Sequence, residues 1–273
     1  QNEPVESIQS SLFDDVRSSR YGSKQLEALN MKDYFDHPKP STLVERLAEI
    51  TMSEGDIAVD FFSGSASSAQ GLIDYMVRKQ IGCRFLLIQL PEQCEGDSAA
   101  SNAGFKTICD IGEERIRRAG DKIKAEVEES NVQLRLGEEP KKLPDIGFRV
   151  FALDDSGIEK PKPGQLVLDV VKPDRSDMDI VFEMMLKWGL ELTLPVEKEE
   201  VSGYPVYSVA CGELVCCLAD GLTMEVLDAI ANMEPRRVLM RDSILTDTLK
   251  LNAVQAFRRV EERAGYEVQL RTV

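Results

Sequence analysis

Residues 57–90 constrain the fold more than any other part of the chain, because they place a strand, a short loop, a helix and a second strand in succession. Residues 57–62 and 84–90 are short apolar runs typical of buried strands, and residues 68–79 carry apolar side chains at helical spacing. A strand, a helix and a strand in this order form a βαβ unit, which requires a parallel sheet and a right-handed crossover. The sequence therefore predicts an α/β protein.

The chain length predicts two compact units, since 273 residues exceed a single domain of roughly 150 residues. We predict a lead-in over residues 1–30, a first portion over 31–140 and a smaller C-terminal α/β domain over 145–273, with the Glu-, Lys- and Pro-rich stretch 137–144 as the boundary. A turn at 210–212 between two strand-like runs predicts a hairpin, and hence a mixed sheet in the C-terminal domain. In that domain we expect strands at 148–153, 166–171, 205–210, 213–218, 237–240 and 266–270, and helices at 178–188, 224–232 and 247–263.

Composition excludes several classes of function. The net charge is −15 and neither half of the chain is basic, which argues against either half gripping a DNA backbone unaided. Six cysteines without a C-x-x-C pair, together with a single histidine, make a zinc cluster implausible and predict buried, reduced thiols in a cytoplasmic protein. The longest apolar runs are far shorter than the ~20 residues that a membrane-spanning helix needs, so we expect no membrane partner.

The strongest local signal for a ligand lies where the first strand ends and the following helix begins. Small residues there allow close approach of the backbone to a ligand, and the helix N-terminus offers unpaired N–H groups. The segment lacks both the G-x-G-x-x-G pattern and the G-K-[ST] ending of a P-loop, so spacing alone favours ligand binding and a plain tight turn equally. Its residues are Asp60, Phe61, Phe62, Ser63, Gly64 and Ser65.

The surroundings of this segment carry a resemblance to a known family. The order His37-Pro38-Lys39-Pro40, a helix with Leu43, and then the 60–65 segment resembles the S-adenosylmethionine (AdoMet) site of DNA amino-methyltransferases, in which a Lys-Pro segment precedes a D-P-F-x-G-S-G strand and loop. The resemblance covers most of the chain from about Ser19. It identifies the modification (Mod) subunit of type III restriction-modification systems, or a close adenine-N6 DNA methyltransferase of permuted (beta-class) motif order. It continues through residues 84–92, 104–108, 111–120, 147–151 and 241–243.

The resemblance implies a partial Rossmann-like methyltransferase sheet with AdoMet as cofactor. It places residues 60–65 on the methionine part of AdoMet, with Lys39, Pro40 and Ser41 on the flanking cofactor segment. For the acidic residue that usually takes the ribose hydroxyls, it leaves Gln89 and Glu92 as alternatives. Ala66 stands where the family has a second glycine, and we expect it to need a negative φ for binding.

The family's methyl-transferring D-P-P-Y segment has no counterpart, because the chain contains no Pro-Pro. In the permuted order that segment and the target-recognition region lie upstream of the cofactor motif. The resemblance therefore implies the C-terminal portion of a methyltransferase acting on the N6 amine of adenine, inactive alone. It also implies DNA bound through the missing upstream region, a possible restriction subunit as partner, a homodimer of the parent protein, and a C-terminal domain for dimerisation or partner contact.

Two other classes of function remain open. One is an interaction or dimerisation module that does not bind AdoMet alone, and the other is a different Rossmann enzyme with a nucleotide cofactor, which the missing G-x-G-x-x-G pattern disfavours. A helix is expected over 110–129, with an inner stripe of Ile111, Ile116, Ala119 and Ile123. We interpret its interleaved basic residues as a solvated face; they are Arg115, Arg117, Arg118, Lys122 and Lys124.

Overall fold

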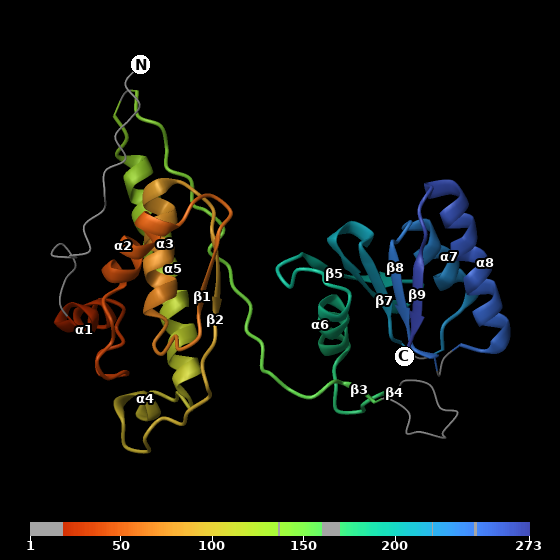
Figure 1. The fold of residues 1–273 in the computed structure, drawn as a ribbon, viewed down its shortest axis with the longest axis horizontal. Helices are drawn as coiled ribbons and strands as arrows, with labels where there is room; N and C mark the ends of the chain where they lie inside the picture. Colours follow the sequence, from red (N-terminus) through yellow and green to blue (C-terminus); the bar gives the residue numbers. More distant parts are fainter. Residues whose placement is uncertain (1–18, 136, 160–169, 220, 243–244) are drawn as a thin grey trace. The chain divides into compact units, whose positions relative to one another are not determined.

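The computed structural model describes residues 19–273 apart from 136, 160–169, 220 and 243–244 (Figure 1). The chain divides into two compact units, residues 1–148 and 149–273, each with its own hydrophobic cores. The stretch 137–144, expected as the boundary, falls within the first unit, because Ile146 and Phe148 pack against the core around α3 (Ser67–Lys79). No helix of the described part is long and apolar enough to cross a membrane.

A βαβ element forms the centre of the first unit, as predicted. β1 (Ile57–Asp60) pairs in parallel with β2 (Arg84–Leu87), and α3 forms the crossover between them. Both strands end earlier than expected, although Ile88 N still donates a hydrogen bond to Asp60 O at 2.8 Å. The carboxyl ends of the two strands therefore lie side by side, where the loop that follows β1 begins.

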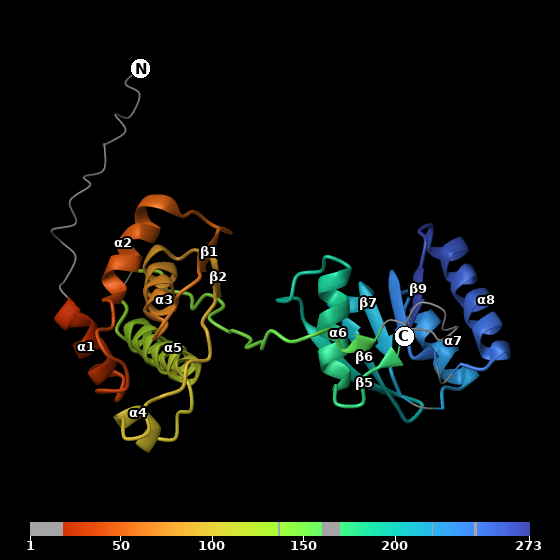
Figure 2. The same cartoon turned by 60° about the horizontal axis from the view of Figure 1, so that its bottom comes forward.

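The described residues of the first unit form four further helices: α1 (Ser19–Ala28), α2 (Ser41–Thr51), the short α4 (Ala99–Asn102) and the long α5 (Ile108–Val132). The start of α5 is fixed by a capping box, in which Thr107 Oγ1 accepts from Asp110 N and the Asp110 carboxylate accepts from Thr107 N. α3 packs between α2 and α5, which is visible in both Figure 1 and Figure 2.

Residues 19–28, which the sequence places in a lead-in segment, form α1 and contribute to a core. Leu26 is 1% exposed and packs with Met31 and Ile111. α1 contains few apolar residues, so its apolar periodicity is weak. Burial of Leu26 in the core stabilises the helix instead. Residues 1–18 of the predicted lead-in lie outside the described residues.

The second unit is built on a five-stranded mixed sheet in the order β5-β6-β7-β8-β9, which confirms the mixed sheet predicted for this domain. The first three strands are antiparallel and the last two pairings are parallel. The β6–β7 hairpin turns through the short 3₁₀ helix η1 (Ala210–Gly212), as expected. The strands are β5 (Val196–Val201), β6 (Tyr204–Val209), β7 (Leu214–Cys217), β8 (Arg237–Met240) and β9 (Gln269–Thr272).

Helices cover both faces of this sheet (Figures 1 and 2). α6 (Asp177–Lys187) buries Ile180, Met184 and Met185 against one face. α7 (Met224–Asn232) and α8 (Asp247–Ala264) cover the other face, with Val226 and Phe257 among the packed residues. These three helices lie where the sequence predicts them.

Three details of the second unit differ from expectation. Residues 148–153 are not a strand; Phe151 instead packs edge-on against Phe182, with ring centroids 4.9 Å apart. β5 was missed, because its central residues are charged and carry no apolar signal. Of the strand expected at 166–171, residues 166–169 lie outside the described residues, and Val170–Val171 form β4, which pairs antiparallel with β3 (Ile158–Glu159). All six cysteines are free, as expected; Cys83, Cys216 and Cys217 are buried as predicted, whereas Cys94 and Cys109 are half-buried and Cys211 is exposed.

Gly71 of α3 allows α2 and α3 to approach closely, and this contact generates a prediction. A Cβ at Gly71 would lie 2.4 Å from the carbonyl oxygen of Ser41, which is main chain and cannot move aside cheaply. Gly71→Ala should therefore lower the free energy of unfolding by about 1–3 kcal/mol in urea titrations followed by circular dichroism. Gly96→Ala is the matched control, since a Cβ there meets no atom within 4 Å. Equal stability of the two variants would contradict the packing described.

Candidate functional site

The loop between β1 and α3 adopts a tight conformation with two residues in the left-handed region. Gly64 has φ 50° and Ala66 has φ 55°, and Ala66 N donates to Ser63 O at 2.8 Å. The sequence analysis makes a negative φ at Ala66 a condition for cofactor binding, and the structure does not meet this condition. The conformation of Ala66 therefore counts against the predicted binding. Alanine takes the backbone conformation that a glycine would take there, at a cost of roughly 1–2 kcal/mol, and its Cβ lies buried beside Gly112.

Asp60, the last residue of β1, fixes the start of the loop through hydrogen bonds to its carboxylate. Its Oδ1 accepts a hydrogen bond from Phe62 N at 3.1 Å, and its Oδ2 accepts one from Ser68 Oγ at the first turn of α3. The carboxylate thus fixes the turn of the chain from strand to helix. Each carboxylate oxygen has two lone-pair sites, so Asp60 keeps the capacity to accept further hydrogen bonds from a ligand.

The loop is joined to the end of the neighbouring strand by Gln89. Gly64 N donates to Gln89 Oε1 at 2.8 Å, and Gln89 Nε2 lies 3.4 Å from Glu92 Oε1. The structure therefore brings together the two candidate segments that the sequence places at the ends of β1 and β2. The Gln89 amide oxygen is engaged by the loop, whereas Glu92 is exposed.

The loop also carries two exposed aromatic rings. Phe61 is 62% exposed and Phe62 is 85% exposed, directly after β1. Ser63 and Ser65 of the same loop are buried. The exposed part of the loop is thus largely aromatic, while its serine side chains are shielded from solvent.

Arg115 of α5 holds the loop from inside, and the sequence analysis missed this role. Its side chain is fully buried, and it donates to Ser65 Oγ at 2.8 Å, to Ser65 O at 3.3 Å and to Gln70 Oε1 at 3.0 Å. Desolvation lowers the pKa of Arg115 to about 10, while the nearby Asp74 carboxylate opposes this shift.

The interpretation of the basic residues on α5 as a solvated face is therefore wrong for Arg115. It is correct for Arg117, which is exposed and forms an ion pair with Glu113. Arg118 is half-buried, and besides its ion pair with Glu114 it donates to the carbonyl oxygens of Leu29 and Asn30. The missed signal is spacing, because Arg115 lies four residues after Ile111 and four before Ala119 and so belongs to the inner stripe.

Lys39, Pro40 and Ser41 lie at the start of α2 and differ in their exposure to solvent. Pro40 is buried as the residue preceding the helix, and Ser41 is completely buried. Gln25 Nε2 donates to Ser41 Oγ at 2.6 Å and Ser41 N donates to Gln25 Oε1 at 2.9 Å, so Ser41 links α1 to α2. Lys39 is the exposed member of the three.

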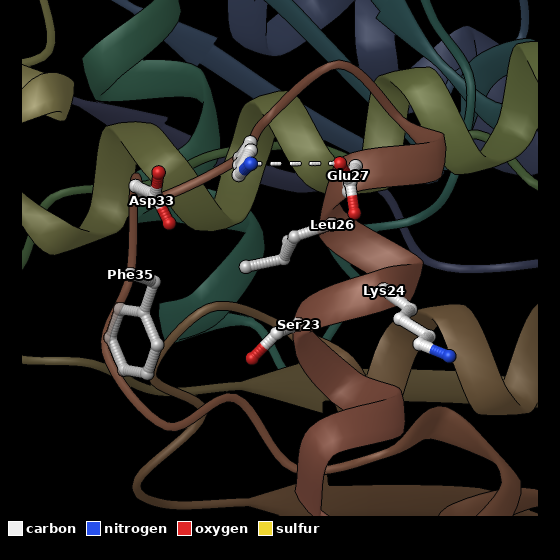
Figure 3. A pocket seen from close by; sticks show the side chains of 7 residues that line it. Ser23, Lys24, Leu26, Glu27, Asp33 and Phe35 are labelled. Carbon is white, nitrogen blue, oxygen red and sulfur yellow. Dashed lines mark ion pairs between the residues drawn. The ribbon is translucent and has the colours of Figure 1, made fainter.

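Two hollows of the first unit lie near these elements, but neither is lined by the loop. One, of about 100 Å³, lies between α1 and the turn after it, with Phe35 and the Lys32–Glu27 ion pair in its wall (Figure 3). It is too small for a nucleoside, since ligand pockets of drug size span roughly 300–1,000 Å³. The Phe35 ring also packs against Gly64, where a Cβ would lie 3.1 Å from Cζ.

The second hollow, of about 440 Å³, is polar and contains a carboxyl group with a raised pKa, that of Asp74. It lies among α1, α2, α3 and α5, and its wall includes Gln70, Asp74 and Lys122. Burial, with added repulsion from Glu45 and Glu126, raises the pKa of Asp74 from 3.8 to about 6.

The raised pKa of Asp74 predicts a specific pH dependence. Between about pH 4 and pH 6 the unfolded chain loses the Asp74 proton while the folded chain keeps it, so stability falls as pH rises. The free energy of unfolding of Asp74→Asn minus that of wild type should therefore grow by about 2–3 kcal/mol across this window. Urea titrations at several pH values measure this difference. Asp121→Asn, on the exposed side of α5, should follow the wild-type curve; a flat difference for Asp74→Asn would contradict the burial described.

The hydrogen bonds of Arg115 predict a local and a global effect of its removal. Arg115→Met would leave the buried oxygens of Ser65 and Gln70 unpaired, at a cost of about 2–4 kcal/mol of stability. Amide exchange of residues 64–66 should also accelerate, as measured by hydrogen-deuterium exchange. Arg117→Met, which removes exposed ion pairs with Glu113 and Glu114 and a cation–π contact with Phe148, should change stability by less than about 1 kcal/mol. Unchanged exchange in the loop of Arg115→Met would exclude the anchoring role.

No protein-family model matches the chain. It is 24% identical over 268 residues to the type III restriction-modification enzyme EcoP15I Mod subunit of Escherichia coli, covering 92% of this chain and 38% of that protein. It is 26% identical over 226 residues to the EcoPI Mod subunit of Escherichia phage P1, covering 78% and 32%. It is 29% identical over 122 residues to the StyLTI Mod subunit of Salmonella typhimurium LT2, covering 45% and 19%. The chain thus spans between a fifth and two fifths of the length of these relatives. It is homologous to a portion of the type III restriction-modification Mod subunits.

Proposed function

We propose that this chain is the cofactor-holding part of an adenine-N6 DNA methyltransferase of a type III restriction-modification system, with AdoMet as the cofactor. The observation that carries the proposal is the small-residue loop at the adjacent carboxyl ends of β1 and β2, on a chain homologous to Mod subunits. Ligands of open α/β sheets bind outside the carboxyl ends of the strands. β1 and β2 would then be two strands of a Rossmann-like methyltransferase sheet.

The residues of the loop fit the methionine part of AdoMet. Gly64 takes its positive φ without the strain that a Cβ would bring, and the Phe35 ring fills the space on that side, so a ligand would approach the main chain from the other side. Asp60 has remaining acceptor capacity for an ammonium group. Among the flanking residues, the exposed Lys39 is the one whose side chain can reach a ligand, while Pro40 and Ser41 would act by fixing the start of α2.

Glu92 is the better candidate for the ribose hydroxyls. Gln89 Oε1 already accepts the Gly64 N–H, which assigns Gln89 to the support of the loop. The Glu92 carboxylate is exposed three residues beyond and can accept hydrogen bonds from two hydroxyl groups. This choice follows from the hydrogen bonds of the two side chains.

The chain supplies cofactor residues and not the methyl-accepting site, because its sequence contains no Pro-Pro and hence no D-P-P-Y segment. AdoMet supplies an activated methyl group when it is bound. Binding of DNA, extrusion of the target adenine, contact with a restriction subunit and dimerisation would belong to the whole protein. The second unit, at residues 149–273, would serve dimerisation or partner contact.

Calorimetric titration with AdoMet tests the proposal. Wild type should bind, and Asp60→Asn and Glu92→Gln should each weaken binding about tenfold, the effect of losing one charge-assisted hydrogen bond of roughly 1.4 kcal/mol. Gln89→Glu should disturb the main-chain amides of the loop, and the new carboxylate should not take over the role of Glu92 in binding the ribose. The control variant is Asp121→Asn, far along α5 from the loop, which should bind as wild type does.

Three outcomes would count against the proposal. Equal AdoMet affinity of wild type and Asp60→Asn would show that the loop is not part of the cofactor site. Absence of binding at millimolar AdoMet would favour the interaction module as the function of the chain alone. A nicotinamide cofactor that bound while AdoMet did not would favour a different Rossmann enzyme.

A further inference from the structure

The second hollow of the first unit is separate from the candidate cofactor site. Its volume of about 440 Å³ lies within the roughly 300–1,000 Å³ that small-molecule pockets span. α1, α2, α3 and α5 surround it, and these helices can be followed in Figure 2. None of the described residues that line it belongs to the loop 60–66, to residues 39–41 or to Gln89 and Glu92.

The carboxylate of Asp74 lies in the wall of this hollow without a cationic partner. Ser41 Oγ donates to Asp74 Oδ2 at 3.5 Å, which is long for a hydrogen bond, and the carboxylate forms no ion pair with any described residue. Burial raises the pKa of Asp74 to about 6, so the group is mostly ionised at neutral pH. Asp74 therefore keeps most of its acceptor capacity for a ligand that carries N–H donors.

Gln70 contributes an unused hydrogen-bond donor to the same wall. Its side chain is only 8% exposed and lines the hollow, and its Oε1 accepts from Arg115 Nε at 3.0 Å. Its Nε2 donates to no other described residue. Because Oε1 is turned toward the buried Arg115, the Nε2 end of the amide faces the hollow. Buried polar groups are nearly always hydrogen-bonded, so this amide favours a ligand with an acceptor oxygen.

The other carboxylates of the wall are already paired. Glu45 accepts from Arg78 Nε at 2.6 Å, and Glu126 lies 3.8 Å from Lys122. Among the described residues, no group of three or more His, Cys, Asp or Glu is placed to hold a metal ion. One unpaired carboxylate beside one neutral amide donor therefore fits a single organic ammonium group with a neutral oxygen nearby, and not a metal ion.

A short apolar strip of α5 completes the wall. Ala119 and Ile123 both line the hollow and are four residues apart, so they lie on the same face of the helix. Their side chains can cover the methylene groups of a ligand. An anionic ligand is disfavoured, because Glu45 and Glu126 already make the surroundings of Asp74 negative.

We propose that the second hollow binds a small amino alcohol. The ammonium group would lie on the Asp74 carboxylate, the hydroxyl oxygen would accept from Gln70 Nε2, and the carbon chain would run along Ala119 and Ile123. The ligand supplies the cation that Asp74 lacks and the acceptor that Gln70 lacks. This inference goes beyond the proposed function, and it requires no binding of AdoMet.

The charges around Asp74 give the binding a specific pH dependence. Glu45 and Glu126 add to the rise of its pKa, and Lys122 opposes it. Between about pH 7 and pH 5 the ionised fraction of Asp74 falls about tenfold, whereas an aliphatic amine stays protonated. The affinity for an amino alcohol should therefore fall about tenfold over this range. The charged and titratable groups that face Asp74 from the neighbouring helices are Tyr21 and Lys24 of α1, Glu45 of α2, and Arg115, Lys122 and Glu126 of α5.

Titration of the whole chain with aminopropanol, followed by nuclear magnetic resonance, tests the site. We expect saturable shifts of the Gln70 side-chain amide signals at neutral pH, with a Kd on the order of 1 mM. Propanediol, in which a hydroxyl replaces the ammonium group, should bind at least about tenfold more weakly. Butylamine, in which a methyl group replaces the hydroxyl, should bind more weakly than aminopropanol and shift the Gln70 amide less.

Asp74→Asn removes the charge and keeps the shape of the side chain. It should weaken aminopropanol binding at least about tenfold and abolish its pH dependence, while circular dichroism shows an intact fold. Asp121→Asn removes the same charge from the exposed side of α5 and should bind as wild type does. The wild-type pH profile is an independent test, since it needs no substitution. Absence of saturable shifts at Gln70, equal binding of propanediol, a constant wild-type affinity down to pH 5, or binding that survives Asp74→Asn would each overturn the proposal.

Discussion

The buried guanidinium of Arg115 is the interaction on which the geometry of the candidate site depends. It reaches from α5 to the loop and satisfies both the carbonyl and the hydroxyl oxygen of Ser65. A buried arginine is costly unless its donors are hydrogen-bonded; Nε and Nη1 of Arg115 bond to Gln70 and Ser65, while Nη2 has no partner among the described residues. The bonds that Arg115 does make join the loop and α5 to each other. Gly112, one turn earlier on α5, lets the helix approach the loop closely, because a Cβ there would lie 3.3 Å from Gly64 O. The conformation of the loop is therefore set by a helix that follows it by more than 40 residues.

Much of this architecture was predictable from local patterns. The β1–α3–β2 order, the hairpin at 210–212 and the helices of the second unit follow from apolar periodicity and turn residues, which act within a few residues. The start and end of the loop could also be located, because small residues follow a strand there. The resemblance to Mod subunits rests on the order of several such segments along the chain. None of these segments would identify the family alone.

The features that escaped prediction depend on contacts between distant parts of the chain. α1 has a weak periodic signal, and Leu26 becomes a core residue only because α5 lies beside it. β5 is nearly all charged, and only its pairing with β6 makes it a strand. The left-handed conformation of Ala66 depends on its hydrogen bond to Ser63 O and on its packing beside Gly112. Neither contact can be inferred from the residue type at position 66 alone. The role of Ser41 likewise depends on Gln25 of another helix.

The charged residues of β5 have a consequence for how the chain can grow. An edge strand with unpaired main-chain groups is a template for other chains, and the run Glu197, Lys198, Glu199 and Glu200 places charge on that edge of the five-stranded sheet. A new strand added there would have to bury or face these charges. The sheet of the second unit is thus protected against extension at β5, whereas β9, its other edge among the described strands, carries Arg271 as its single charged residue. Growth of this sheet by a further strand is therefore directed to the β9 edge and away from the β5 edge.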